Sequence, residues 1–229
     1  MTESLVNRPD TSDMAAVHKV FRSSLASAPQ FVASVQSDER RELVANYYAN
    51  VMALLETHHD TEDELLFPLL IERVPDHRVV IVEEVESQHA EVVGLTRAVN
   101  ETLTSWQSAG DSVRPDTVRV LLALEAVLSP HMDQEEAQVV PLAAEYLTVE
   151  EWGKLPGHSL GNFTGDKMWL ILGLVRENFS EAQRVAMLEH MSPASRESWE
   201  RTGEASFNGL ISQLRQTTGI PANKGVLVR

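Results

Sequence analysis

Two stretches of the chain carry histidine and glutamate at the same spacing. One begins at His58 and reads HHDTEDELLFP, and the other begins at His131 and reads HMDQEEAQVVP. In each stretch a glutamate follows four residues after the histidine, at Glu62 and at Glu135, and a proline follows after ten. Residues four apart lie on one face of an α-helix, roughly 6 Å apart along its axis. An imidazole and a carboxylate can therefore approach the same metal ion.

Two further histidines, His18 and His89, lie within apolar stripes of helical period. A single histidine on such a stripe is most often an ordinary core residue. Six residues of these types on inward stripes favour a metal site instead. Unpaired carboxylates in an apolar core cost several kcal/mol each, and a bound cation removes that cost. Two carboxylates and four imidazoles suit two metal ions better than one. The candidate ligands are His18, His58, Glu62, His89, His131 and Glu135.

The composition limits which metal ligands and which binding partners the protein can have. The chain has 229 residues, a net charge of −15 and no cysteine. Disulfides, thiolate ligands and iron–sulfur clusters are excluded, and nitrogen and oxygen ligands suit iron or manganese, with zinc as an alternative. The negative charge argues against nucleic acid and anionic membrane surfaces as partners. The N-terminal residues are polar and lack the apolar region of a signal peptide, so we expect a cytoplasmic protein.

The apolar periodicity predicts an all-α fold. Long helices are expected at about 10–27, 38–73, 77–107 and 115–146, with an irregular connection over 28–37. Helices of this kind with short turns pack as an antiparallel four-helix bundle. Counted from the turns, Glu62, His89 and His131 then lie within about one helical turn of the same height. His18 reaches that height only if 28–37 runs along the bundle.

The second of these helices sets the inward register. A stripe through Leu55, His58, Glu62, Leu65 and Leu69 is more apolar than one through the neighbouring His59, so His59 is expected to face solvent. We also expect Pro68 to bend this helix, and Pro130 to distort the fourth helix just before His131. Three other histidines, His77, His158 and His190, are expected at the surface or in caps. Asp60 and Asp133 recur beside the candidate ligands and have either an outer-shell role or ordinary solvated charge.

The last third of the chain has a different sequence pattern, with more helix-breaking residues and shorter predicted helices. A capping box at Thr148–Glu151 and a stretch rich in glycine and proline precede three further predicted helices, at 168–175, 180–191 and 193–215. We therefore predict two domains, a bundle over 1–147 and a helical extension over 148–229. The aromatic residues of the extension are expected to pack on the bundle: Phe163, Trp169, Trp199 and Phe207. The final residues are expected to be loose.

The ligand set and the EDELLFP ending resemble the hemerythrin-like (HHE cation-binding) proteins, in particular the actinobacterial type, over about residues 10–147. The resemblance implies two iron ions per chain in a non-haem centre, joined by an oxo or hydroxo bridge, inside a four-helix bundle. Each half of the chain supplies one histidine and then a His-x-x-x-Glu motif. His18 and His58 would therefore bind one ion and His89 and His131 the other. Glu62 and Glu135 would bridge them, and His59→Ala would leave the metal content nearly unchanged.

This sequence departs from the oxygen-carrying hemerythrins at two places. Their third helix has two histidines four residues apart, whereas Val85 and Val93 flank His89 here, and their final Asp is replaced by Glu135. One fewer histidine argues against simple O₂ carriage and favours chemistry with peroxide, nitric oxide or O₂. We expect catalase-like decomposition of hydrogen peroxide in oxidative or nitrosative stress. The alternatives are a module that binds or senses O₂, NO or iron without turnover, and a metal-free structural bundle.

Overall fold

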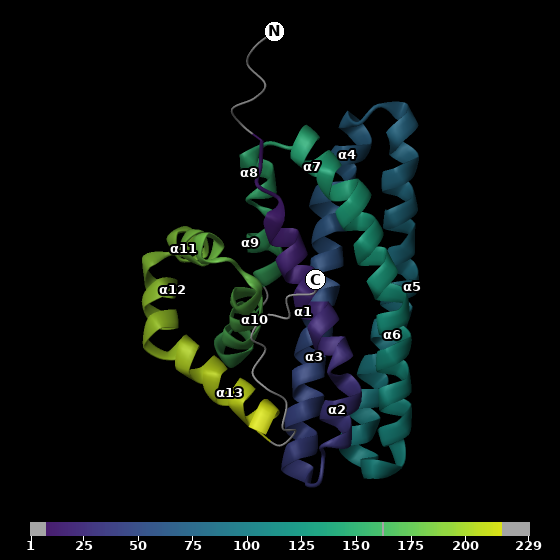
Figure 1. The fold of residues 1–229 in the computed structure, drawn as a ribbon, viewed down its shortest axis with the longest axis vertical. Helices are drawn as coiled ribbons and strands as arrows, with labels where there is room; N and C mark the ends of the chain where they lie inside the picture. The colour runs from purple at the N-terminus through teal and green to yellow at the C-terminus, as the bar shows by residue number, and fades with distance from the viewer. Residues whose placement is uncertain (1–7, 162, 217–229) are drawn as a thin grey trace, which may run out of the picture.

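The computed structural model describes residues 8–161 and 163–216. All regular structure in this part of the chain is helical. Four long helical runs stand side by side, and each runs antiparallel to the next along the chain (Figure 1). The predicted all-α antiparallel bundle is confirmed. Its elements are α1 (Ser12–Ala26), α2 (Ala28–Ala33), α3 (Asp38–Thr61), η1 (Glu62–Leu66), α4 (Phe67–Arg73), α5 (Asp76–Ala109), η2 (Gly110–Val113), α6 (Arg114–Gln134), η3 (Glu135–Val139) and α7 (Val140–Tyr146).

Helix α5 shows how the apolar pattern forms the bundle. Its buried residues recur at intervals of three and four, which places them on a single face. Charged residues occupy the opposite face and keep it in solvent. The buried set includes the whole predicted stripe: Val82, Val85, His89, Val92, Thr96, Val99 and Leu103. His89 is therefore held at mid-helix by the apolar residues above and below it.

The connection over 28–37 is more regular than expected. Helix α1 ends at Ala26, before Pro29 as predicted, but the chain resumes helical conformation at once as α2. Pro29 lies in the first turn of α2, where a missing backbone N–H costs nothing. The prediction of an irregular connection was therefore wrong for 28–33. This second helix carries the chain further along the bundle and helps His18 to reach the level of the other candidates.

Two π-helical segments, η1 and η3, interrupt the second and fourth long runs at equivalent places. η1 begins at Glu62 and ends just before Phe67, whose backbone N–H donates to the Glu62 carbonyl. Pro68 is the second residue of α4 that follows, and Pro141 holds the same place in α7. A proline ring clashes with the carbonyl four residues earlier in a regular α-helix, and a wider π turn relieves that clash. The local irregularity expected from Pro68 is thus a π turn.

The extra residue of η1 changes which side chains face the core. The predicted inward positions Leu65 and Leu69 are only half-buried, whereas Leu66 and Leu70 are fully buried. The predicted register was wrong beyond Glu62 because a π turn inserts one residue and moves every later side chain by one position. As a result Phe67 also turns inward and is fully buried.

The C-terminal helices pack on one side of the bundle, against α1 and α3 (Figure 1). The predicted capping box is present at Thr148, and the three predicted helical regions are helical, while two short helices were missed. Phe163, Trp199 and Phe207 are buried in the same core as the bundle residues, and Trp169 is partly buried against it. The elements are α8 (Val149–Trp152), α9 (Leu155–Leu160), α10 (Gly165–Asn178), α11 (Glu181–His190), α12 (Pro193–Ser198), η4 (Trp199–Gly203) and α13 (Glu204–Gln216).

The junction near residue 147 lies in the turn between α7 and α8. Contacts across it include Arg40 of α3, which donates hydrogen bonds of 2.6 Å to the carbonyls of Gln213 and Leu214 near the end of α13. The division into two domains stays a prediction, and the expected loose tail lies outside the described residues. Among the described helices, none has the length and apolar character needed to cross a bilayer.

Candidate metal centre

The bundle brings the six candidate ligands to one level in its interior, and all six are buried. They come from four helical runs, so only the tertiary fold places them together. Each histidine is on a regular helix and each glutamate opens a π segment. The positions are His18 on α1, His58 on α3, Glu62 on η1, His89 on α5, His131 on α6 and Glu135 on η3.

Four of these residues form a first group, which we call cluster A: His18, His58, Glu62 and Glu135. The Nε2 atoms of His18 and His58 lie 3.2 Å apart. Glu62 Oε1 lies 3.2 Å from His58 Nε2, and Glu135 Oε2 lies 3.2 Å from His18 Nε2. Two imidazoles and two carboxylates therefore converge on one point, a donor set that suits a divalent iron, manganese or zinc ion.

A second group, cluster B, consists of His59, His89 and His131. Their potential ligand atoms lie within 4.8 Å of one another. The other carboxylate oxygen of Glu62, Oε2, lies 3.6 Å from His89 Nε2. Glu62 thus faces cluster A with one oxygen and cluster B with the other.

The position of His59 corrects the sequence analysis. This residue was expected to face solvent, but only 3% of its surface is exposed, and its ring stacks on that of His89 at a centroid distance of 4.1 Å. The expectation failed because α3 is covered on more than one side, by α5 within the bundle and by α9, α10 and α1. A helix packed on several sides buries a wide face, so neighbouring residues can both be interior. His158 and His77 are exposed, as expected, and the side chain of His190 lies outside the described set.

Unpaired buried atoms show that the two clusters fit metal ions. Seven of their nitrogen and oxygen atoms are buried without a hydrogen-bond partner among the described residues, namely the Nε2 atoms of His59, His89 and His131 and both carboxylate oxygens of Glu62 and of Glu135. Buried polar groups in proteins are normally hydrogen-bonded, and leaving so many unpaired is costly. Cations bound by these atoms would remove the penalty.

The electrostatics of the metal-free chain match a ligand role. Burial and the neighbouring Glu135 raise the pKa of Glu62 well above its ordinary value. Burial would raise the pKa of Glu135 as well, but His18 outweighs it and lowers that pKa to about 2. Burial, reinforced by nearby histidines, lowers the pKa of His58 to about 3 and, despite the opposing charge of Glu135, that of His131 to about 4. These two imidazoles are therefore neutral at pH 7, and metals bind the neutral form.

Outer partners orient three of the histidines. His89 Nδ1 donates to Asp63 at 2.8 Å, and His18 Nδ1 donates to Glu136 at 2.7 Å. His131 Nδ1 lies 3.0 Å from the amide oxygen of Gln88 and donates to it. An N–H held on the outer side leaves the lone pair of Nε2 directed inward, toward the centre. The structure therefore selects the ligand tautomer for His18, His89 and His131.

The two acidic partners occupy equivalent places in the repeat, which the sequence analysis missed. Asp63 directly follows Glu62, and Glu136 directly follows Glu135, so each half of the chain supplies the acid that holds a histidine of the other half. The recurring acid after the glutamate was the available signal. Asp133 acts one step further out, through Arg22, which donates to both Asp133 and Glu136. Asp60 is exposed.

We predict that Asp63→Asn weakens metal binding at cluster B. The change removes the charge that stabilises the His89 N–H, and losing such an outer partner typically costs ~10–100-fold in metal affinity. The measurement is competition with a chelator of known affinity. Asp60→Asn, three residues away and exposed, is the matched control and should bind as the wild type does. Equal affinities for the two variants would contradict the role of Asp63.

Aromatic rings cover the two clusters from the apolar side. Phe21 lies 5.4 Å from His58, and Phe67 lies 5.3 Å from His89, both measured between ring centroids. Both phenylalanines are fully buried. Phe67 lies beside His89 because the π turn brings it inward. These rings occupy space directly beside His58 and His89.

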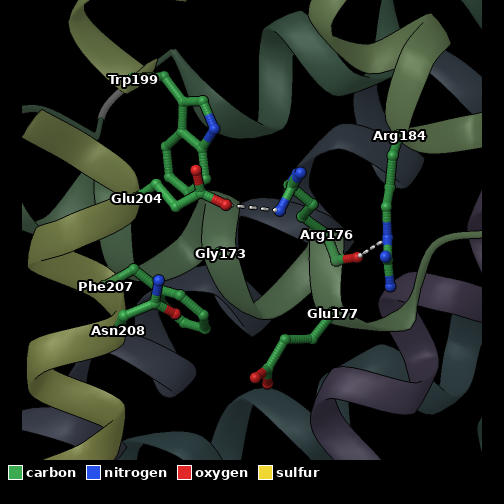
Figure 2. A pocket seen from close by; sticks show the side chains of 8 residues that line it. All are labelled: Gly173, Arg176, Glu177, Arg184, Trp199, Glu204, Phe207 and Asn208. Atoms are coloured by element: carbon green, nitrogen blue, oxygen red, sulfur yellow. Dashed lines mark hydrogen bonds and ion pairs between the residues drawn. The ribbon is translucent and has the colours of Figure 1, made fainter. Parts of the chain in front are cut away.

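A separate cavity of about 170 Å³ lies in the C-terminal layer, between α10 and α13 (Figure 2). It contains none of the candidate ligands. Arg176 spans it to Glu204 at 3.2 Å, and Arg184 donates to the backbone carbonyl of Arg176. These two arginines are thus engaged by the chain's own groups, and the cavity has no evident link to the metal centre.

Histidines and carboxylates that converge in the core of a helical bundle are typical of metal-binding bundles, and this chain has that arrangement. The Hemerythrin HHE cation binding domain matches residues 10–143, which is more than half of the chain. The chain therefore belongs to the hemerythrin HHE cation-binding family. Searches of the curated proteins and of the solved structures find no match to it.

Proposed function

We propose that the chain binds two iron ions, one in each cluster, and decomposes hydrogen peroxide. The single observation that carries the metal pair is the position of Glu62, whose two carboxylate oxygens face cluster A and cluster B separately. A carboxylate placed in this way joins two ions into one unit. Family membership supports a metal-binding role, and iron is the metal that the resemblance implies.

The candidate ligands and the neighbouring phenylalanines have different roles in this proposal. When bound, a pair of iron ions supplies electrons in twos, as the conversion of peroxide to water and O₂ requires. Histidines His18, His58, His89 and His131 hold the ions as neutral donors, and Glu62 and Glu135 neutralise their charge. Phe21 and Phe67 exclude bulky molecules from the centre. The centre is thus suited to a small neutral reactant such as hydrogen peroxide.

The apolar side chains around the clusters are also the reason that we expect a low rate of peroxide decomposition. The phenylalanine rings beside His58 and His89 offer no acid or base, and the carboxylate of Glu136 is held by His18 and Arg22. Proton transfer by a positioned group typically contributes ~10²–10⁴-fold to a rate. Peroxide decomposition should therefore be slower than that of a dedicated haem catalase. Azide, a small anion, should compete at the same place.

The test follows O₂ release from hydrogen peroxide. Iron-loaded wild type should release O₂ and azide should inhibit it, whereas Glu135→Ala should lose both the metal and the activity. Glu125→Ala, a substitution on the same helical run outside the clusters, is the control and should retain both. If Glu135→Ala loses its metal yet keeps full activity, the activity belongs to adventitious iron. A metal-loaded protein without O₂ release would favour binding or sensing of O₂, NO or iron instead.

A further inference from the structure

His59 occupies an unusual place for a residue that the motif does not include. It adjoins the motif histidine His58 but turns toward the other side of the centre, to His89 and His131. Its ring stacks on His89 with an interplanar angle of 18° and meets the ring of His131 edge-on at 5.3 Å. Its Nε2 atom is buried and has no hydrogen-bond partner among the described residues.

We propose that His59 is a third histidine ligand in cluster B, which makes the metal centre unsymmetrical. Cluster A then offers two imidazoles and cluster B three. This inference rests on the proposed metal pair. It replaces the symmetric arrangement of two histidines per ion that the repeated His-x-x-x-Glu motif implies. The motif cannot reveal the difference, because Met132 stands at the place in the second half that His59 holds in the first.

An ordinary packing role for His59 does not account for the unpaired nitrogen. Stacking on His89 needs only a flat ring, and a buried imidazole nitrogen without a partner costs free energy. The structure places one ring nitrogen of His59 within 4.8 Å of one from His89 and one from His131. The Nε2 atoms of His89 and His131 are likewise buried without a partner among the described residues. Three convergent imidazoles are a recognised donor set for one metal ion, as in three-histidine zinc sites.

The unequal donor count determines where an external ligand binds. If both Glu62 and Glu135 are shared by the two ions, as the resemblance implies, an ion in cluster B has one more protein ligand than an ion in cluster A. It then has one position fewer for a small molecule. Peroxide or azide should therefore bind first on the side of His18 and His58.

The test compares ⁵⁷Fe-loaded wild type with His59→Phe and His59→Ala. His59→Phe keeps a flat ring against His89 but removes the nitrogen, so it separates ligation from packing. His77→Ala, a substitution of an exposed histidine, is the control. In the wild type we expect two Mössbauer doublets of equal area and one azide bound per iron pair. In both His59 variants we expect the two doublets to merge or one iron to be lost. Where both irons remain, a second azide should bind.

The outcomes separate this inference from the proposed function. Wild type without an iron pair contradicts the proposed function itself. A wild type with an iron pair, together with a His59→Phe spectrum and azide stoichiometry unchanged from it, overturns the ligand role of His59 alone. If His59→Ala fails to fold, as circular dichroism of the metal-free protein would show, His59→Phe decides the matter. A His77→Ala protein that behaves like the His59 variants would also overturn the inference.

Discussion

Glu62→Gln should lower the iron content of the purified protein from about two ions per chain to nearly none, since metals bind deprotonated ligands and a glutamine at position 62 cannot supply a carboxylate to either cluster. The substitution keeps the size of the side chain but removes its charge and one of its two acceptor oxygens. In the structure Oε1 faces His58 and Oε2 faces His89, so a single change affects both clusters. Peroxide decomposition should disappear with the metal. Elemental analysis after loading with Fe(II) gives the metal content directly.

The matched control is Glu64→Gln, two residues further along the same π segment. Glu64 is exposed and contacts His158 at the surface. This variant should bind iron and react with peroxide as the wild type does. If Glu62→Gln retained one iron per chain, Glu62 would serve one cluster only and the bridging placement would be wrong.

The metal-free protein should lose stability steeply as the pH falls from 6.5 toward 4. His58 and His131 have ordinary pKa values of 6.5 when exposed but about 3 and about 4 in the fold, and burial also lowers the pKa of His59 strongly. The unfolded chain therefore binds more protons than the fold in this range, and stability rises with pH. A tenfold difference in proton affinity between the two states is worth about 1.4 kcal/mol, so three such histidines together have a large effect on the free energy of unfolding.

Within the two clusters, two groups act in the opposite direction. Glu62 has a raised pKa because of burial and Glu135, and His18 has a raised pKa because Glu135 and Glu136 outweigh its burial. These two groups add stability below their unfolded pKa values. We expect the three histidines with lowered pKa values to dominate between pH 6.5 and pH 4, so that the net effect of acid is unfolding.

Thermal melts of the chelator-treated protein, followed by circular dichroism at several pH values, measure this effect. The melting temperature should fall across that range. The iron-loaded protein is the control: it should melt higher at every pH that retains the metal, because a ligand that binds only the fold stabilises it. A melting temperature of the metal-free chain that stays level from pH 7 to pH 4 would contradict the burial of neutral histidines.

The sequence alone was sufficient for the architecture and for the six candidate ligands. Helical periodicity is a local property, so the α5 stripe and the heights of Glu62, His89 and His131 could be derived from spacing and turn positions. Pro68 also marked an irregular place, the π turn of η1, whereas α6 continues as an α-helix through Pro130, where a distortion was expected. The repeat of His-x-x-x-Glu pointed to the interior of the bundle because buried carboxylates require compensation.

The tertiary structure decided the details that depend on neighbours. Whether the side of α3 that carries His59 is buried depends on how many helices cover α3, and no local sequence pattern records that number. The π turn at Glu62 moved the core register by one residue and brought Phe67 inward, because the relief of a proline clash is settled by packing. The acids Asp63 and Glu136 met His89 and His18 only across the two halves. The candidate ligands could thus be recognised largely from local spacing, whereas the contacts of His59 and of the two outer acids arose between segments distant in sequence.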